Sequence, residues 1–266
     1  MPIAPADFIA GMAKGMAVLE SFNTERQRLN ASQAAQRAGL TRAAARRHLL
    51  TLAHLGYLET DGSHYWLTPK VLRFSGSYLA SARLPKTVQP VLNRLAALYP
   101  DAFSVAVLDA DAVVIVARSM SLAAPIQGAS TGAGPMRWLA HGLHLGARLP
   151  AHATSTGRVL LAAKSEAALD EWLGQHPLPR LTAHTETERA RLCAALAQVR
   201  AQDHAVASEM HELGVHAVAV PLRDMAGHTV AALNAVISSQ RLHHGAVARE
   251  LLPALLDAAR ELRGVL

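Results

Sequence analysis

With 266 residues, of which 51% are hydrophobic and 4% aromatic, the chain is long enough for one large packed domain or two smaller ones. Its single cysteine, Cys193, excludes an intramolecular disulfide. Residues 1–7 carry no signal-peptide pattern, and no apolar run reaches about 18 residues, so we expect a cytoplasmic protein without a membrane span. The formal net charge is +6, and residues 1–85 hold 10 of the 26 Lys and Arg but 5 of the 20 Asp and Glu, so most of the basic excess lies there, as phosphate binding requires.

The first third of the chain begins with two predicted helices. Residues 8–22 have the apolar spacing of an amphipathic helix that can brace the helices after it. A second helix begins at Asn30, whose side chain can cap it, and Gln33 lies three residues later, which is the spacing of a capping box. Gly39 ends this helix, because glycine adopts the left-handed conformation found after helices.

A third helix is predicted over residues 41–55, with Thr41 as its cap. Three apolar residues share one face of it: Ala45, Leu49 and Leu52. The rest of the helix is free of acidic residues and combines small side chains, which allow a close approach to a DNA groove, with arginines that reach phosphates or guanine edges. The predicted DNA-binding residues are Arg42, Ala43, Ala44, Arg46, Arg47 and His48.

A short hairpin comes after this helix. Residues 57–60 and 64–67 are rich in aromatic and apolar residues and flank Asp61 and Gly62, a strong signal for a hairpin turn. Helix, turn, helix and hairpin together predict a winged helix-turn-helix, which is a DNA-reading device. The alternative is an ordinary scaffold whose exposed arginines are only solvated.

The rest of the chain predicts a linker helix and a second domain. We place the DNA-binding domain at residues 1–69, the linker helix at residues 70–85, ending at Leu84 and Pro85, and the second domain at residues 86–266. We expect helices over residues 86–98, 155–164, 166–175, 186–203 and 247–262, strands over residues 102–109, 112–119, 136–142, 205–210, 216–224 and 229–238, and a loop over residues 122–135. Consecutive strands joined by short turns favour an antiparallel α+β domain.

Over nearly its whole length the sequence resembles the IclR family of bacterial transcriptional regulators. The matching stretches are AKGMAVL (13–19), GLTR (39–42), RHLL (47–50), GYL (56–58), LPAHATSTGRVLLA (149–162), Glu209 with LGV (213–215), and AVPLRD (219–224) with Gly227. Their order and spacing together are specific. The stretches TERQRL (24–29) and TRAAARRH (41–48) look closest to the subgroup that responds to protocatechuate, 4-hydroxybenzoate and related aromatic acids.

This resemblance implies an α+β protein with an N-terminal winged helix-turn-helix, a linker helix and a C-terminal GAF-like effector domain with a curved antiparallel sheet. It also implies a homodimer or tetramer that binds palindromic promoter DNA, whose symmetry mirrors that of the protein. The family contains activators and repressors, so RNA polymerase is an expected partner only for an activator. We predict no membrane partner and no cofactor.

The resemblance further implies an effector site. The N–H groups at a helix N-terminus suit a carboxylate, and the family's matching turn assigns that role to Ser155 and Thr156. The segments that line the family's pocket imply seven further residues: Trp138, His141, Leu149, Ala207, Ala217, Asn234 and Val236. Because Ala207 and Ala217 are small and apolar, the pocket favours an aromatic carboxylic acid, on which Trp138 could stack. Asn234 or His141 could bind a ring substituent, and the alternative for each residue is a plain core position.

We predict a DNA-binding regulator of an aromatic catabolic operon rather than an enzyme. The 14 histidines form no His-Glu-x-x-His spacing, so we expect no metal, and Ser155 lies in no Gly-x-Ser-x-Gly motif. Cys193 is predicted inside a helix without an activating basic partner, and Glu209 and His211 share the face of a predicted strand without a nucleophile. The alternatives are a dimeric DNA-binding repressor without a ligand and a metal-dependent enzyme.

Overall fold

A computed structural model describes residues 3–23, 26–119 and 144–266. The chain divides into two compact units, Met1–Ala80 and Ser81–Leu266, and each is described by itself. Within the described ranges, no helix combines the length and the apolarity needed to cross a membrane. The predicted loop over residues 122–135 and the predicted strand over residues 136–142 lie outside the described residues.

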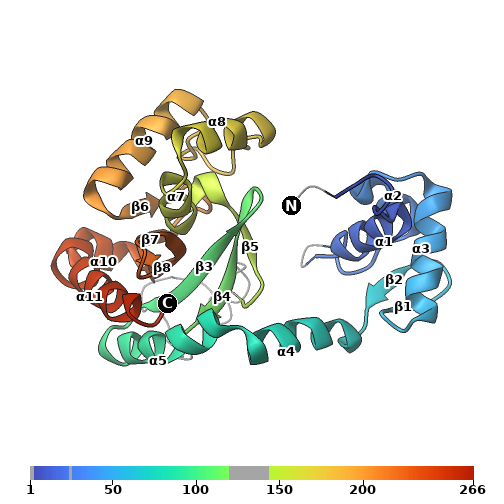
Figure 1. Cartoon of the computed structure of the whole chain (residues 1–266), viewed down its shortest axis with the longest axis horizontal. Helices are drawn as coiled ribbons and strands as arrows, with labels where there is room; N and C mark the ends of the chain where they lie inside the picture. The colour runs from blue at the N-terminus through green and yellow to red at the C-terminus, as the bar shows by residue number, and fades with distance from the viewer. Residues whose placement is uncertain (1–2, 24–25, 120–143) are drawn as a thin grey trace. The chain divides into compact units, whose positions relative to one another are not determined.

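The first unit is a three-helix cluster followed by a hairpin and a further helix (Figure 1). Its elements are α1 (Ala10–Glu20), α2 (Ala31–Ala38), α3 (Arg42–His54), β1 (Leu58–Thr60), β2 (Tyr65–Leu67), η1 (Pro69–Val71) and α4 (Leu72–Ser81). The core of this unit contains Val18, Leu29 and Leu49, whose side chains are fully buried. The predicted helix-turn-helix with a wing is therefore confirmed.

The helix boundaries of this unit follow the local chemistry of the sequence. Both bonds of the capping box are present, since Asn30 Oδ1 accepts from the backbone N–H of Gln33 and the Gln33 side chain accepts from the backbone N–H of Asn30. Gly39 ends α2 in the left-handed conformation, at a φ of 65°. Thr41 Oγ1 then accepts from the Ala44 N–H and begins α3.

Asp61 closes the turn of the wing. Its Oδ1 accepts hydrogen bonds from the N–H groups of Ser63, at 2.9 Å, and His64, at 2.8 Å. Because these bonds favour the charged carboxylate, they lower the pKa of Asp61 to about 2. Gly62 takes a φ of 92°, which an ordinary side chain would resist.

The helix after the wing is tied to the end of α3. Lys70 Nζ donates to the carbonyl of Leu55, which follows α3, at 2.6 Å, and the ring of Phe74 stacks on that of Tyr57 at 5.8 Å. The predicted end of this helix at Leu84 and Pro85 is wrong. Helix α4 ends at Ser81, and α5 (Arg83–Leu98) begins two residues later with Pro85 in its first turn, where proline removes no helical hydrogen bond.

The second unit is built on a six-stranded antiparallel sheet. The strands are β3 (Ala102–Asp109), β4 (Ala112–Arg118), β5 (Arg148–Pro150), β6 (Ala205–Ser208), β7 (His216–Arg223) and β8 (Thr229–Ile237), in the spatial order β5-β4-β3-β8-β7-β6. The helical segments are α5, η2 (Ala151–Ala153), α7 (Ser155–Ala162), α8 (Glu166–Gln175), α9 (Arg189–Gln202), α10 (Ser239–His243), η3 (Val247–Leu251) and α11 (Leu252–Arg263). This is the expected α+β class.

Helices cover the two faces of this sheet and bury two separate cores. On one face, α5 and α11 pack against residues such as Phe103, Val220 and Leu233. On the other face, α7 packs against the sheet, and α8 and α9 join it in a second core that includes small sheet residues such as Ala205 and Ala219 (Figure 1). The small residues leave room for α7 to lie close to the sheet.

The sequence did not reveal every element of this unit. The three-residue strand β5 and the five-residue helix α10 are too short to give a periodic pattern. The prediction that Glu209 and His211 share a strand face is also wrong, because β6 ends at Ser208 and Glu209 has a φ of 56°, which turns the chain out of the strand.

Candidate functional site

Helix α3 presents a basic, uncrowded surface. Arg42, Arg46 and Arg47 are exposed, as is Ala43, and among the described residues no carboxylate lies within ion-pairing distance of these three guanidinium groups. A helix of this kind can approach a polyanion without first breaking salt bridges. Its cations remain available to phosphates and base edges.

The two remaining residues predicted for this surface are less accessible. Ala44 and His48 are half-buried, and Nδ1 of His48 lies 3.7 Å from the position that a side-chain carbon would take at Gly15 on α1. His48 therefore packs near α1, whereas the arginines face solvent. The accessible part of the surface consists of Arg42, Ala43, Arg46 and Arg47.

The second unit contains a cavity on the α7 face of the sheet. Its empty volume is about 550 Å³, open solvent at the mouth included. The residues that line it are Leu149, Ala153, Thr154, Ser155, Thr156, Ala207, Met210, His211, Glu212, Val215, Ala217, Asn234 and Val236. Seven of the nine residues predicted for the effector site are thus brought together, and the other two, Trp138 and His141, lie outside the described residues.

Cross-strand register builds the floor of the cavity. Ala207 pairs with Ala217, and Ala217 pairs with Val236, so these three side chains stand in one row across β6, β7 and β8. Leu149 comes from β5, at the opposite edge of the sheet from β6. A sheet whose two edge strands line the same cavity must be strongly curved, as the resemblance implied.

The N-terminus of α7 forms one end of the cavity. Thr154 Oγ1 accepts from the N–H of Gly157 at 3.1 Å, which begins the helix as predicted. Within the described residues, no backbone or capping bond engages the N–H groups of Ser155 and Thr156. The helix dipole and two such N–H groups suit a small anion.

Helix α7 approaches the preceding turn unusually closely. A side-chain carbon at Gly157 would lie 2.0 Å from the carbonyl oxygen of Ala151, which real carbon atoms do not tolerate. Glycine is therefore required at this position. This close approach places the first turn of α7 against the cavity rather than at the surface, and the whole helix from Ser155 to Ala162 is buried.

Buried basic groups lie beside this helix terminus. Arg158 is 6% exposed, its Nε donates to the carbonyl of His152 at 3.1 Å, and its Nη2 has no hydrogen-bond partner among the described residues. Burial lowers the pKa of Arg158, and the charge of Glu186 acts in the opposite direction. Burial also lowers the pKa of His152, so this side chain is neutral at physiological pH. With His152 neutral, the positive charge beside this terminus is that of Arg158, and it favours an anion.

Asn234 provides a polar group on the floor. The hydroxyl of Ser104 donates to Asn234 Oδ1 at 2.5 Å, and both residues are buried on paired strands. With its oxygen engaged, the amide nitrogen is the atom left to donate to a ligand. A cavity that is mostly apolar, with an anion-binding end and one amide, matches an aromatic acid that carries a polar ring substituent.

The structure adds cavity residues that sequence reasoning missed. Met210, His211, Glu212 and Val215 belong to the loop between β6 and β7, while Ala153 and Thr154 precede α7. In the sequence, this loop was marked only by Leu213 and Gly214, which belong to a family motif and indicated no role in a cavity. Within the part of the chain that the structure describes, no group of three or more His, Cys, Asp or Glu side chains could hold a metal ion.

Comparison with known families decides the relationship. The model of the bacterial transcriptional regulator IclR C-terminal domain matches residues 76–263, and that of the IclR helix-turn-helix domain matches residues 11–62. The chain belongs to the IclR family. As an IclR-family protein it is a transcriptional regulator with a DNA-binding helix-turn-helix, and the resemblance read from the sequence is confirmed.

Three similar proteins refine this placement within the IclR family. The Pca operon regulatory protein of Acinetobacter baylyi is 50% identical over 260 residues, which cover 98% of this chain and 90% of that protein. The p-hydroxybenzoate hydroxylase transcriptional activator of the same organism is 46% identical over 263 residues, covering 99% and 94%. A crystal structure of the inducer-binding domain of an Acinetobacter PobR double mutant with 3-hydroxybenzoic acid shares 40% identity at a TM-score of 0.59 and covers 70% of this chain and 100% of that one.

Proposed function

We propose that this IclR-family regulator senses a small aromatic carboxylate in the cavity of its second unit and thereby controls genes of aromatic catabolism. The observation that carries the proposal is the buried N-terminus of α7, with Ser155 and Thr156 at one end of a mostly apolar cavity. The carboxylate would accept hydrogen bonds from these two residues. The ring would lie over Ala207, Ala217 and Val236.

The similar proteins support the choice of ligand. Two relatives with nearly half or more of their residues identical are named for the pca operon and for p-hydroxybenzoate hydroxylase, and a similar inducer-binding domain was crystallised with 3-hydroxybenzoic acid. A hydroxyl group on the ring would find a donor in the amide of Asn234. Trp138 and His141, which lie outside the described residues, stay predictions for this site.

On the DNA side, Arg42, Ala43, Arg46 and Arg47 would contact the major groove, with Ala44 and His48 at its margin. We propose a homodimer or tetramer on a palindromic site, and exposed apolar side chains in the first unit support an interface between copies. Met12 and Met16 on α1 are 68% and 50% exposed, and Leu72 on α4 is 63% exposed. Surfaces of this kind are typical of association sites.

The ligand would act by shifting the population of two arrangements of the dimer. It can do so only through a difference in its affinity for the two states. One arrangement would place the two recognition helices, or a contact with RNA polymerase, correctly for transcription. The proposed location is the cytoplasm, where the promoter DNA is.

Isothermal titration calorimetry with benzoate, 3-hydroxybenzoate and 4-hydroxybenzoate tests the ligand site. Ser155→Pro removes the first N–H of α7 yet suits a first helical position, because Thr154 before it has the extended backbone that proline demands. Ser155→Ala removes only the hydroxyl and is the matched control. We expect the wild type to bind, Ser155→Pro to lose at least tenfold in affinity and Ser155→Ala to lose less. Absence of binding by the wild type would contradict the proposed function.

A further inference from the structure

The loop between β6 and β7 forms a wall of the cavity without belonging to any regular element. This wall loop, residues 209–215, contributes Met210, His211, Glu212 and Val215 to the lining. It closes on itself, since the N–H of Glu209 donates to the Val215 carbonyl at 2.7 Å and the N–H of Gly214 donates to Glu209 Oε1 at 2.8 Å. These bonds fix the shape of the loop but do not fix its distance from α7.

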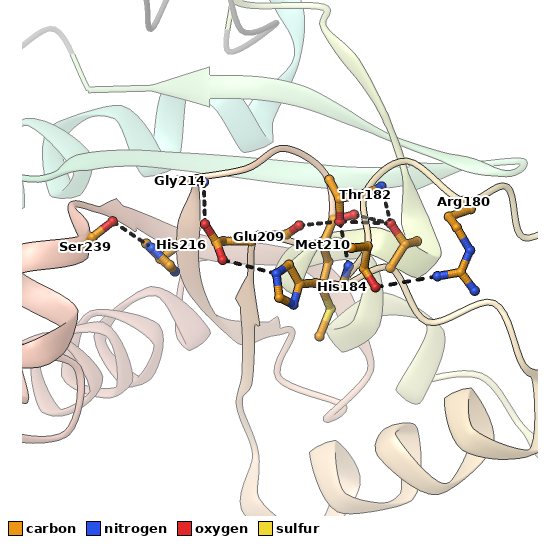
Figure 2. Close-up of polar contacts among 10 residues, drawn as sticks. Arg180, Thr182, His184, Glu209, Met210, Gly214, His216 and Ser239 are labelled. Carbon is orange, nitrogen blue, oxygen red and sulfur yellow. Dashed lines mark hydrogen bonds and ion pairs between the residues drawn. The ribbon is translucent and has the colours of Figure 1, made fainter. Parts of the chain in front are cut away.

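A neighbouring turn holds the wall loop from outside the cavity. This anchor turn, residues 182–185, precedes α9, and Figure 2 shows Thr182 and His184 facing Glu209 and Met210. The hydroxyl of Thr182 donates to the carbonyl of Glu209 at 2.6 Å, and the hydroxyl of Thr185 donates to the carbonyl of Met210 at 2.7 Å. In addition, His184 Nε2 lies 3.5 Å from Glu209 Oε2.

The anchor turn fixes the direction of both hydroxyl groups. Thr185 Oγ1 accepts from the N–H groups of Leu181, at 3.1 Å, and Thr182, at 2.8 Å, while Thr182 Oγ1 accepts from the N–H of His184 at 3.0 Å. A hydroxyl has one hydrogen to donate. Because both lone pairs of Thr185 Oγ1 serve the anchor turn, its hydrogen is directed to the wall loop. The Thr182 hydroxyl has two acceptors within reach, the Glu209 carbonyl at 2.6 Å and Thr185 Oγ1 at 3.3 Å, and the shorter distance favours the carbonyl.

Burial makes the contact from Thr185 the stronger constraint. Thr185 is 4% exposed, so little water reaches its hydrogen bond to the Met210 carbonyl. If the hydroxyl were removed, water could not readily replace it as the donor to that carbonyl. Thr182 is only half-buried. Neither threonine is among the described residues that line the cavity, so an effect of either one on ligand binding would pass through the wall loop.

We infer that the anchor turn sets the position of the wall loop and thereby which ring substituents the cavity accepts, with Thr182 and Thr185 as positioning residues for effector selectivity. The inference rests on the proposed function. The two hydroxyls hold consecutive carbonyls, those of Glu209 and Met210, and therefore fix both the height and the tilt of the segment after them. That segment carries Met210, His211 and Glu212 into the cavity.

The test uses the full chain and measures by calorimetry the affinities of benzoate, 3-hydroxybenzoate and 4-hydroxybenzoate. Thr185→Val removes the donor with little change in shape, and Thr185→Ser restores it. Thr187→Val is the matched control, because the Thr187 hydroxyl accepts from Arg180 Nη2 on the same segment and the hydrogen bonds of the described residues give it no contact with the wall loop. Circular dichroism and the melting temperature establish folding.

We expect Thr185→Val to change the ratio of the dissociation constants of the two tightest ligands by at least threefold, while Thr185→Ser and Thr187→Val keep the wild-type ratio. A smaller change in the folded Thr185→Val protein, whatever its melting temperature, would overturn the inference. If Thr185→Val fails to fold, Thr182→Val takes its place, because Thr182 is only half-buried. The same threefold change in the ratio of dissociation constants is then required. A wild type that binds none of the acids refutes the proposed function itself, which distinguishes the two failures.

Discussion

The two units each carry a helix that begins with the same local chemistry and meets a different environment. In α3, Thr41 Oγ1 accepts from the N–H of Ala44, and in α7, Thr154 Oγ1 accepts from the N–H of Gly157. Helix α3 then exposes arginines, whereas every residue of α7 is buried. Both N-termini attract anions. In our proposal, the surroundings of each helix select its anion: DNA at the exposed α3 and a small carboxylate in the cavity at α7.

The units also differ in how much of their function depends on burial. The proposed DNA-binding surface of α3 would need only a stable helix, because its arginines lie in solvent. The proposed effector site at α7 would need three features at once: the close contact of Gly157 with Ala151, the small residues of the sheet, and the wall loop. Substitutions should therefore reduce function in small steps in the first unit and abruptly in the second.

The largest effect is expected from Gly157→Ala. The added carbon would meet the Ala151 carbonyl at 2.0 Å, so the backbone must shift, at a cost of about 3 kcal/mol or more in the free energy of unfolding. Hydrogen exchange should rise across the second unit and stay unchanged in α2 and α3. Gly174→Ala is the control: nothing lies within 4 Å of the added carbon on α8, so stability should be equal or slightly higher. Equal exchange in the two variants would show that the approach of α7 to Ala151 does not require glycine, and an equal rise in α2 and α3 would remove the distinction between the units.

A smaller, graded effect is expected from Arg46→Ala. Loss of one phosphate or base contact should weaken binding to promoter DNA by about tenfold, or roughly 1.4 kcal/mol, and leave the melting temperature unchanged. If the contact is to phosphate, the dependence of affinity on salt should also decrease. Arg191→Ala removes the same charge from the exposed surface of α9 and should leave DNA affinity within twofold. A similar loss of DNA affinity in both variants would show that Arg46 acts only through the overall charge of the protein and not through a contact made by α3.

The smallest effect is a difference in acid stability. Burial lowers the pKa values of His152 and His216 in the second unit. When the pH falls below roughly 6.5, the ordinary pKa of histidine, the two side chains therefore bind protons in the unfolded chain more readily than in the folded unit. Stability of this unit should fall as the pH drops from 7.5 to 5.5. Asp61 in the wing has its pKa lowered from 3.8 to about 2, so its contribution should be constant between pH 7.5 and 5.5 and be lost only as the pH falls from about 3.8 to about 2.

Hydrogen exchange at the two pH values measures both units in the same sample, after correction for the intrinsic exchange rate. His152→Gln should flatten the pH dependence of the second unit. An unchanged stability of the second unit between pH 7.5 and 5.5 would show that proton uptake by these histidines contributes nothing to it.

The caps and the wing were predictable because they depend on neighbours in the sequence. Asn30 with Gln33, and Thr41 with the next residues of its helix, specify their helix starts through bonds that span three residues. Asp61 and Gly62 specify the turn in the same way. The charge surplus of the first third followed from composition alone.

The cavity was predictable only through the family resemblance. Ala207, Ala217 and Val236 are ordinary strand residues, and their row arises from a register that no local pattern contains. The wall loop was missed because Glu209 adopts a left-handed backbone that glycine or asparagine would have signalled. Its anchor, Thr185, lies 25 residues from Met210, so no spacing rule could connect them.

The central claim is that an aromatic acid bound at the N-terminus of α7 controls DNA binding through α3. Fluorescence anisotropy of labelled DNA from upstream of the protein's own gene tests it most directly. The DNA is titrated with wild type or Ser155→Pro, without acid and with benzoate, 3-hydroxybenzoate or 4-hydroxybenzoate. We expect equal DNA affinity for both proteins without the acid, and an acid-dependent change in the wild type alone. An equal response of both proteins, or no response of the wild type to any of the three benzoates, would contradict the account.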